Sequence, residues 1–196
     1  WAGATLHALG PELFAHGFAL PNLGDVDVQT QAGAIATGTH GTGRGLRNLS
    51  SAVVGVHGID AGGEPFSWTD DAALAAGRVS LGALGVVCAI DWQLVDAHRL
   101  HERTERTSVE QALDGLGERA ATTRHVELFW YPARDRVDLK TLVPTEAACD
   151  PLPDRPWERI DESFRVLPSV REQRFVEMEY AVPERDGVDL FLALRA

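Results

Sequence analysis

The stretch Ala32-Gly33-Ala34-Ile35-Ala36-Thr37-Gly38-Thr39-His40-Gly41-Thr42-Gly43-Arg44-Gly45 decides the fold, because glycines and hydroxyl residues gather there and bulky side chains are almost absent. Glycine permits positive φ and has no Cβ, so successive backbone N–H groups can converge on an anion or on the edge of a ring. Thr37, Thr39 and Thr42 add hydroxyl groups that donate and accept hydrogen bonds. The stretch is therefore suited to close approach between the backbone and another group.

Three interpretations of this stretch compete. A glycine-rich turn between two strands is favoured on composition alone. A phosphate loop does not fit because no lysine follows the glycines, and the dinucleotide pattern fails because Gly41, Gly43 and Gly45 are spaced by twos. The third interpretation is a loop that surrounds a large cofactor without either phosphate motif.

Four other segments extend the pattern outward from this loop. They are Leu20-Pro21-Asn22-Leu23-Gly24-Asp25-Val26-Asp27, Leu81-Gly82-Ala83-Leu84-Gly85-Val86-Val87, His125-Val126-Glu127-Leu128-Phe129-Trp130-Tyr131-Pro132 and Phe175-Val176-Glu177-Met178-Glu179-Tyr180-Ala181-Val182-Pro183. In this order the five segments resemble the aldonolactone oxidases and alditol oxidases, which are vanillyl-alcohol-oxidase-type flavoproteins. Five motifs in one order are far more specific than any single motif.

The resemblance implies an α+β fold with FAD as cofactor. It places the C-terminal part of a two-part (PCMH-type) FAD-binding domain at residues 1–100 and an incomplete α+β substrate (cap) domain at residues 101–196. The cofactor contacts that it implies are Gly33, Ala34, Thr37, Gly38, Thr39, His40, Gly41, Thr42, Gly43, Gly85 and Val86. For Gly38, Thr39, His40 and Gly41 we expect the contact to be made through backbone N–H groups.

The activity implied by the resemblance is oxidation of a CH–OH group of a sugar-derived lactone or alditol. Hydride passes to flavin N5 while a base removes the hydroxyl proton. Oxygen or another acceptor then reoxidises the flavin, and no residue decides between an oxidase and a dehydrogenase. The alternative is a catalytically incompetent half-domain or interaction module that no longer retains FAD.

The same resemblance implies that about half of a family member is represented. The family's pyrophosphate-binding loop and the histidine that many members link to flavin belong to a segment that precedes these motifs. We therefore expect the isolated chain to bind FAD weakly, because each charge-assisted contact to a pyrophosphate contributes about 1.5 to 3 kcal/mol. We also expect it to show no measurable oxidation of a lactone or alditol.

Individual side chains carry further hypotheses. Thr30 stands where the alditol oxidases place a hydroxyl near the substrate, with an ordinary strand threonine as the alternative. Glu177 and Glu179 are separated by two positions on an expected strand, so both would point to one face, for acid–base chemistry or simply toward solvent. We expect His40 to have a structural or flavin-contacting role rather than to act as the base, and Asn22 and Asp25 to cap a turn or bind cofactor.

Composition narrows the partners. The chain has 196 residues and a net charge of -11, which argues against nucleic-acid and anionic-membrane surfaces. No apolar run approaches the length of a membrane span, so we expect a cytoplasmic protein, with peripheral membrane association as the alternative. Cys88 and Cys149 show no metal-ligand spacing, and we expect Cys88 to be a buried thiol in a long buried strand.

Local patterns predict the remaining elements. Helical spacing predicts a helix from Leu6 to His16, and β-branched runs predict hairpins at residues 52–68 and 125–143. Ser108 begins a capped helix. The charge-rich run His98–Arg106 is expected to be a solvated connector at the domain boundary, with an anion site as the alternative. A short helix through residues 157–164 and a strand over residues 175–182 complete the expectation.

Overall fold

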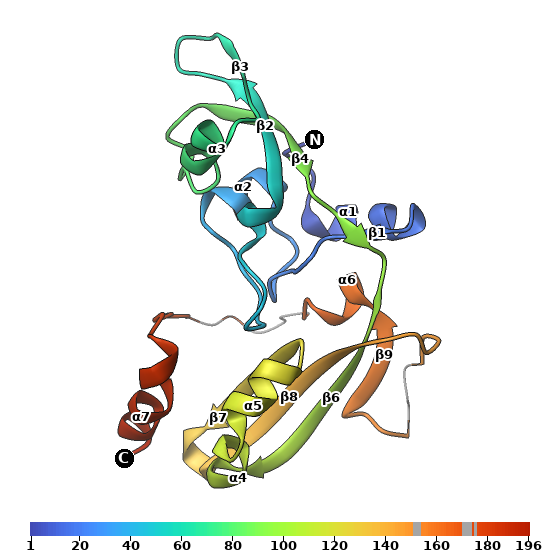
Figure 1. Ribbon diagram of the computed structural model, residues 1–196, viewed down its shortest axis with the longest axis vertical. Coiled ribbons are helices and arrows are strands. Elements are labelled where there is room, and N and C mark those ends of the chain that lie inside the picture. Colours follow the sequence, from blue (N-terminus) through green and yellow to red (C-terminus); the bar gives the residue numbers. More distant parts are fainter. Residues whose placement is uncertain (151–153, 170–173, 175) are drawn as a thin grey trace.

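Two regions follow one another along the chain, an upper region with a three-stranded sheet and a lower region with a four-stranded sheet (Figure 1). The computed structural model describes residues 1–150, 154–169, 174 and 176–196. The upper region contains α1 Leu6–Ala15, β1 Phe18–Ala19, α2 Gln31–Ala36, the 3-10 helix η1 Leu49–Ala52, β2 Val53–Ile59, β3 Pro65–Trp68, α3 Asp71–Gly77, β4 Val86–Trp92 and β5 Val95–Asp96. The lower region contains β6 Arg99–Ser108, α4 Val109–Leu113, α5 Leu116–Thr122, β7 His125–Tyr131, η2 Pro132–Arg134, β8 Arg136–Thr145, β9 Glu158–Glu162, α6 Ser163–Val166 and α7 Glu184–Arg195.

The upper region is built on an antiparallel sheet in the order β3-β2-β4. The hairpin of β2 and β3 confirms the prediction from the β-branched run, and α1 confirms the predicted first helix. Ile35 of α2 and Leu74 of α3 pack with Val53 and Val56 of β2 in a small core. This packing holds α2, and with it the start of the glycine-rich stretch, against the sheet.

The lower region is an antiparallel sheet in the order β7-β8-β6-β9. β7 and β8 form the predicted hairpin, and a capping box of Ser108 and Gln111 starts α4 as predicted. One face of the sheet is apolar, and its Val137 and Leu139 pack on Val109 and Ala112 of α4. The opposite face carries polar side chains over most of its length.

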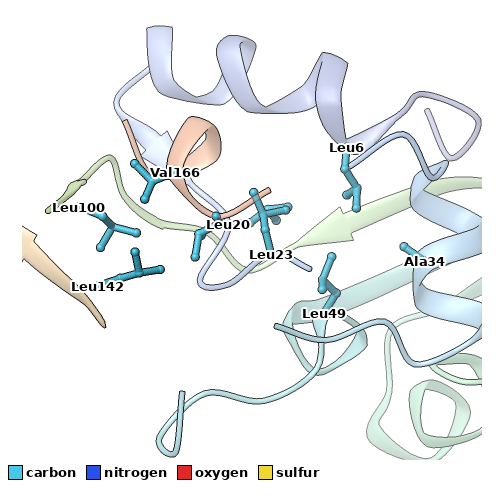
Figure 2. Packing of buried hydrophobic residues seen from close by; sticks show 9 residues of the cluster. Leu6, Leu20, Leu23, Ala34, Leu49, Leu100, Leu142 and Val166 are labelled. Atoms are coloured by element: carbon cyan, nitrogen blue, oxygen red, sulfur yellow. The ribbon is translucent and has the colours of Figure 1, made fainter. Parts of the chain in front are cut away.

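A third core joins the two regions. Its buried residues are Leu6, Leu20, Leu23, Ala34, Leu49, Leu100, Leu142, Val166 and Leu167. Figure 2 shows Leu100 and Leu142 of the lower sheet beside Val166, with Leu20 and Leu23 of the upper region next to them and Leu6, Leu49 and Ala34 further along the same core. This core places the glycine-rich loop of the upper region against the lower sheet.

The charged run at residues 98–106 was wrongly expected to be a connector. It forms most of β6, which pairs with β8 on one side and β9 on the other. Several of its charged side chains find partners on neighbouring strands; Glu102, for example, accepts from Arg159 Nε at 2.6 Å. The helix expected through residues 157–164 is also wrong, because Glu158–Glu162 pairs with β6 and only Ser163–Val166 is helical.

Two other expectations fail. Residues 176–183 form no strand, and within the described part of the chain no strand pairs with them, so the period-two argument for Glu177 and Glu179 loses its basis. Phe175, the first residue of that expected strand, lies outside the described residues. Cys88 is exposed because burial along β4 alternates, so that strand is only half buried.

Candidate functional site

The glycine-rich stretch is a short helix followed by a loop. The favoured interpretation from composition, a turn between two strands, is therefore wrong: α2 precedes the loop and η1 follows it. Thr30 is the N-cap of α2, and its Oγ1 accepts from Gly33 N at 3.2 Å. At the other end Thr39 N donates to Ala34 O at 3.0 Å, and Gly38 adopts φ +72°, a conformation that favours glycine.

The loop after Gly38 is anchored by a buried asparagine. Asn22 is 4% exposed; its Nδ2 donates to Thr42 O at 3.0 Å, and its Oδ1 accepts from Leu23 N at 3.0 Å. A Cβ at position 41 would collide with Leu23 O and approach Asn22 Oδ1 to 2.7 Å. Gly41 is thus required by close packing of the loop on residues 22–23, and Asn22 has the turn-stabilising role that was one of its two interpretations.

The lower sheet holds the same loop from the other side. His125 Nδ1 lies 3.0 Å from Thr42 O, and because a carbonyl oxygen only accepts, the proton is assigned to Nδ1. Thr42 Oγ1 donates to Glu127 Oε1 at 3.2 Å. Arg124 Nη2 donates to Pro21 O at 2.6 Å. The first residues of β7 therefore fix the position of the loop.

Burial keeps His125 neutral. Its side chain is fully buried, and this burial, assisted by the neighbouring Arg124 guanidinium, lowers the pKa of His125 to about 4. Burial also lowers the pKa of His98, which lies near it. A neutral imidazole at pH 7 donates from Nδ1 to the Thr42 carbonyl without placing a buried charge beside Arg124.

A cleft of about 650 Å³ opens between the loop and the lower sheet, a volume within the range of small-molecule and cofactor sites. Its lining comprises Leu23, Gly24, Asp25, Val26, Gln29, Thr37, Gly38, Thr39, His40, Gly41, Thr42, Glu127, Leu167, Val176, Glu177 and Glu179. His40 Nε2 lies 2.8 Å from Glu179 Oε1, with both side chains exposed. The cleft thus combines residues of the loop with the carboxylates of Asp25, Glu127, Glu177 and Glu179.

Backbone donors in the loop divide into two pairs. Gly38 N and Thr39 N donate to Ile35 O and Ala34 O, so they close the end of α2. In the part of the chain that the structure describes, His40 N and Gly41 N donate to no protein acceptor. The expectation of four N–H contacts to a cofactor stays a prediction, and only two of the four groups have no protein acceptor among the described residues.

The structure brings some predicted site residues together and leaves others apart. Thr37, Gly38, Thr39, His40, Gly41, Thr42, Glu177 and Glu179 line one cleft. Ala34 is buried in the joining core, and Gly43, with φ +108°, packs against Arg124 O. Gly85 directly precedes β4, and Val86 begins it opposite Ile59; a Cβ at Gly85 would collide with Ile59 O.

The glycine-containing segment at residues 81–87 contacts the end of α2, because Leu81 N donates to Ala36 O at 3.0 Å. Gly33 lies in the first turn of α2, where its N–H donates to the hydroxyl oxygen of Thr30. The cofactor roles of Gly33, Gly85 and Val86 and the substrate role of Thr30 stay predictions.

Sequence reasoning missed His125 and Glu127. The signal was present, since both polar residues stand two apart in a strand whose intervening Val126 and following Leu128 are apolar. Alternation of this kind places the two polar side chains on the face opposite the apolar core.

Within the described residues, no helix is long and apolar enough to cross a membrane.

Comparisons with known proteins show what the chain is similar to. Residues 1–68 match the profile of the FAD binding domain family. The chain is 33% identical to the L-gulono-1,4-lactone dehydrogenase of Mycobacterium tuberculosis over an alignment of 226 positions, gaps included. This alignment covers 94% of this chain and 52% of that protein. It is 33% identical to the L-gulonolactone oxidase of Bos taurus, over 70% of this chain and 32% of that protein.

Among solved structures, a cholesterol oxidase from Brevibacterium sterolicum superposes with a TM-score of 0.67 at 18% identity, covering 75% of this chain and 32% of that one. At this identity the likeness concerns the fold alone. The chain spans about half the length of the mycobacterial relative.

Proposed function

The chain belongs to the aldonolactone oxidase family of FAD-dependent flavoproteins, and we propose that it serves in the oxidation of a CH–OH group of a sugar-derived lactone or alditol. FAD is its cofactor. The observation that carries the proposal is the cleft of about 650 Å³, because the glycine-rich loop and Glu127 of the lower sheet both line it.

The loop offers a surface that suits a flat heterocycle. Between Thr37 and Thr42 its side chains are short apart from His40, and the N–H groups of His40 and Gly41 lack protein acceptors within the described residues. When bound, the flavin supplies the hydride acceptor for the oxidation. We propose that these two N–H groups bind the ring edge, and that Asn22 and His125 hold the loop in place through Thr42 O.

The substrate is then placed between the ring and the lower sheet. Glu177 and Glu179 remain the candidates for holding or removing the hydroxyl proton, since both line the cleft. Glu179 is already 2.8 Å from His40 Nε2, an arrangement that keeps its carboxylate beside the loop. Reoxidation by oxygen or by another acceptor belongs to the proposal, and the relatives' names include both an oxidase and a dehydrogenase.

The test is FAD titration followed by anaerobic addition of L-gulono-1,4-lactone, monitored by the visible absorbance of the flavin. It is done on the chain and on the chain extended by the N-terminal pyrophosphate-binding segment that the family resemblance implies. We expect weak, saturable binding by the chain, and tight retention with lactone-dependent bleaching in the extended protein. Two colourless, folded proteins whose thermal stability does not rise with FAD would favour an interaction module instead.

A further inference from the structure

One row of side chains on the polar face of the lower sheet lies at the cleft. Residues on adjacent strands share a face when they are paired, and Glu127 of β7 is paired with Lys140 of β8, which is paired with Thr104 of β6. Two residues earlier, His125 and Leu142 form the row that the upper region covers. The Glu127 row therefore lies about 7 Å along the strands from the His125 row, at the edge of the area that the upper region covers.

Glu127 is the sheet residue that lines the cleft. Its side chain is 23% exposed, and that of Lys140 is 12% exposed. Glu127 Oε1 accepts from the Thr42 hydroxyl at 3.2 Å and lies 3.7 Å from Lys140 Nζ, which is longer than a direct hydrogen bond. In the described part of the chain Oε2 accepts no hydrogen bond from protein.

This arrangement leaves acceptor capacity that the protein does not use. A carboxylate has about four acceptor positions, and removing it from water is costly unless they are filled. One neutral hydroxyl and an ammonium group at 3.7 Å leave most of them free. Neighbouring hydroxyls of a polyol or sugar lactone present two donors at a spacing that one carboxylate can accept.

The other charged residues of the cleft indicate which charge its ligand carries. Asp25, Glu177 and Glu179 also line it, and no lysine or arginine is among the described lining residues. A lining of this kind repels an anion. It therefore favours the closed, neutral lactone over the open-chain aldonate, which carries a carboxylate of its own.

We propose that Glu127 is a substrate-binding residue that accepts hydrogen bonds from neighbouring hydroxyls of a neutral lactone or alditol, and that it discriminates against the aldonate anion. Lys140 is a positioning residue, because its Nζ lies 3.7 Å from Glu127 Oε1 and places a positive charge beside the carboxylate that accepts from Thr42. The inference rests on the proposed function, because it takes the cleft to be the place where substrate lies against the loop.

The experiment compares binding of L-gulono-1,4-lactone and L-gulonate to the FAD-loaded chain under anaerobic conditions. Affinity is measured by titration calorimetry and by the flavin difference spectrum. For the wild type we expect the lactone to bind at least about tenfold more tightly than gulonate. Because hydrogen bonds to charged groups are the stronger ones, E127Q is expected to weaken lactone binding by about tenfold and to narrow that preference.

The matched control is E105Q. Glu105 lies on β6 of the same sheet, is exposed, and points to the opposite face from Thr104 and Glu127. E105Q removes one negative charge, as E127Q does, but at a residue that does not line the cleft. The affinities for the lactone and for gulonate should therefore stay at the wild-type values. A purely structural role of Glu127 would change stability but not the ratio of the two affinities.

A second variant keeps the test open if E127Q does not fold. E127D retains the charge but withdraws the carboxylate by one methylene, so it should lose lactone affinity while still rejecting gulonate. Wild-type affinities in a folded E127Q or E127D would overturn the proposal, as would a wild type that prefers gulonate or binds neither ligand. Failure of FAD to bind would count against the proposed function, and saturation-transfer NMR of the two ligands on the unloaded chain would then decide the role of Glu127.

Discussion

The glycine-rich loop and the four-stranded sheet form the two sides of one cleft by opposite means. The loop presents backbone groups, and its shape is fixed by contacts such as Asn22 Nδ2 to Thr42 O. The sheet presents charged side chains on a regular ladder, with Glu127 opposite Lys140. Substitutions in the loop should therefore act through geometry, and substitutions on the sheet through charge.

The largest expected change in stability comes from a substitution in the core that joins the two regions. Leu142 is 1% exposed within it, and Leu142→Ala should destabilise the protein by about 2 to 5 kcal/mol. Since this core contains residues of both regions, amide exchange in β2 and β8 should accelerate together. Leu139→Ala, in the core that belongs to the lower region alone, is the control and should accelerate β8 more than β2. Equal patterns for the two variants would show that the regions do not share a core.

His125 makes stability depend on pH. Its folded-state pKa of about 4 lies below the ordinary value of 6.5, so the unfolded chain binds more protons between these values and stability falls as pH falls. The slope should approach 1.4 kcal/mol per pH unit, or about 3 kcal/mol over the window, to which the lowered pKa of His98 adds.

Chemical unfolding at a series of pH values measures this slope. His125→Asn should flatten it, whereas His16→Gln, on an exposed residue, should leave it unchanged. The cations that face His125, Arg124 and Lys140, lower its pKa in the same direction as burial. A wild-type slope that persists in His125→Asn would contradict the assignment of a buried neutral imidazole.

Gly41 tests the backbone side of the cleft. Gly41→Ala places a Cβ against Leu23 O, so the loop must shift, and FAD affinity should fall by at least about tenfold. Gly45→Ala is the matched control in the same loop, because a Cβ there meets nothing within 4 Å. Fluorescence titration with FAD measures both, and equal affinities would remove Gly41 from the cofactor site.

The exposed pair of His40 and Glu179 should give the smallest effect. Ion pairs between exposed side chains contribute less than about 1 kcal/mol, and added salt weakens them. Glu179→Gln should therefore change thermal stability only slightly while FAD affinity stays near the wild-type value. A large loss of FAD affinity in this variant would mean that the pair orders the loop, and not merely the segment around residue 179.

Local sequence signals were sufficient for the hairpins and the helix caps. The turn between β7 and β8 contains Asp135 at φ +43°, a residue type that tolerates this conformation, and Ser108 with Gln111 gives a complete capping box. Such features depend on residues close together in the chain. They were predicted correctly because the information is local.

The failures have a different origin. Only Leu100 is fully buried in β6, so its charged sequence shows no apolar alternation, and its pairing with β8 and β9 decides its structure. Val176 to Val182 has the composition of a strand but no partner strand among the described residues. The contact between Thr42 and His125 joins residues 83 positions apart, which no local pattern encodes. The cleft could therefore be assigned to the loop from sequence, whereas its second side could not.

The central claim is that the loop binds flavin through its free backbone donors, and hydrogen exchange with mass spectrometry tests it most directly. Adding FAD should slow exchange of the amides of His40 and Gly41 within a peptide that covers residues 37–43. The hairpin turn at residues 60–64, which lies outside the cleft, serves as the internal control and should exchange at an unchanged rate. Unaltered exchange at residues 37–43 while FAD is bound, or protection confined to another segment, would contradict the account.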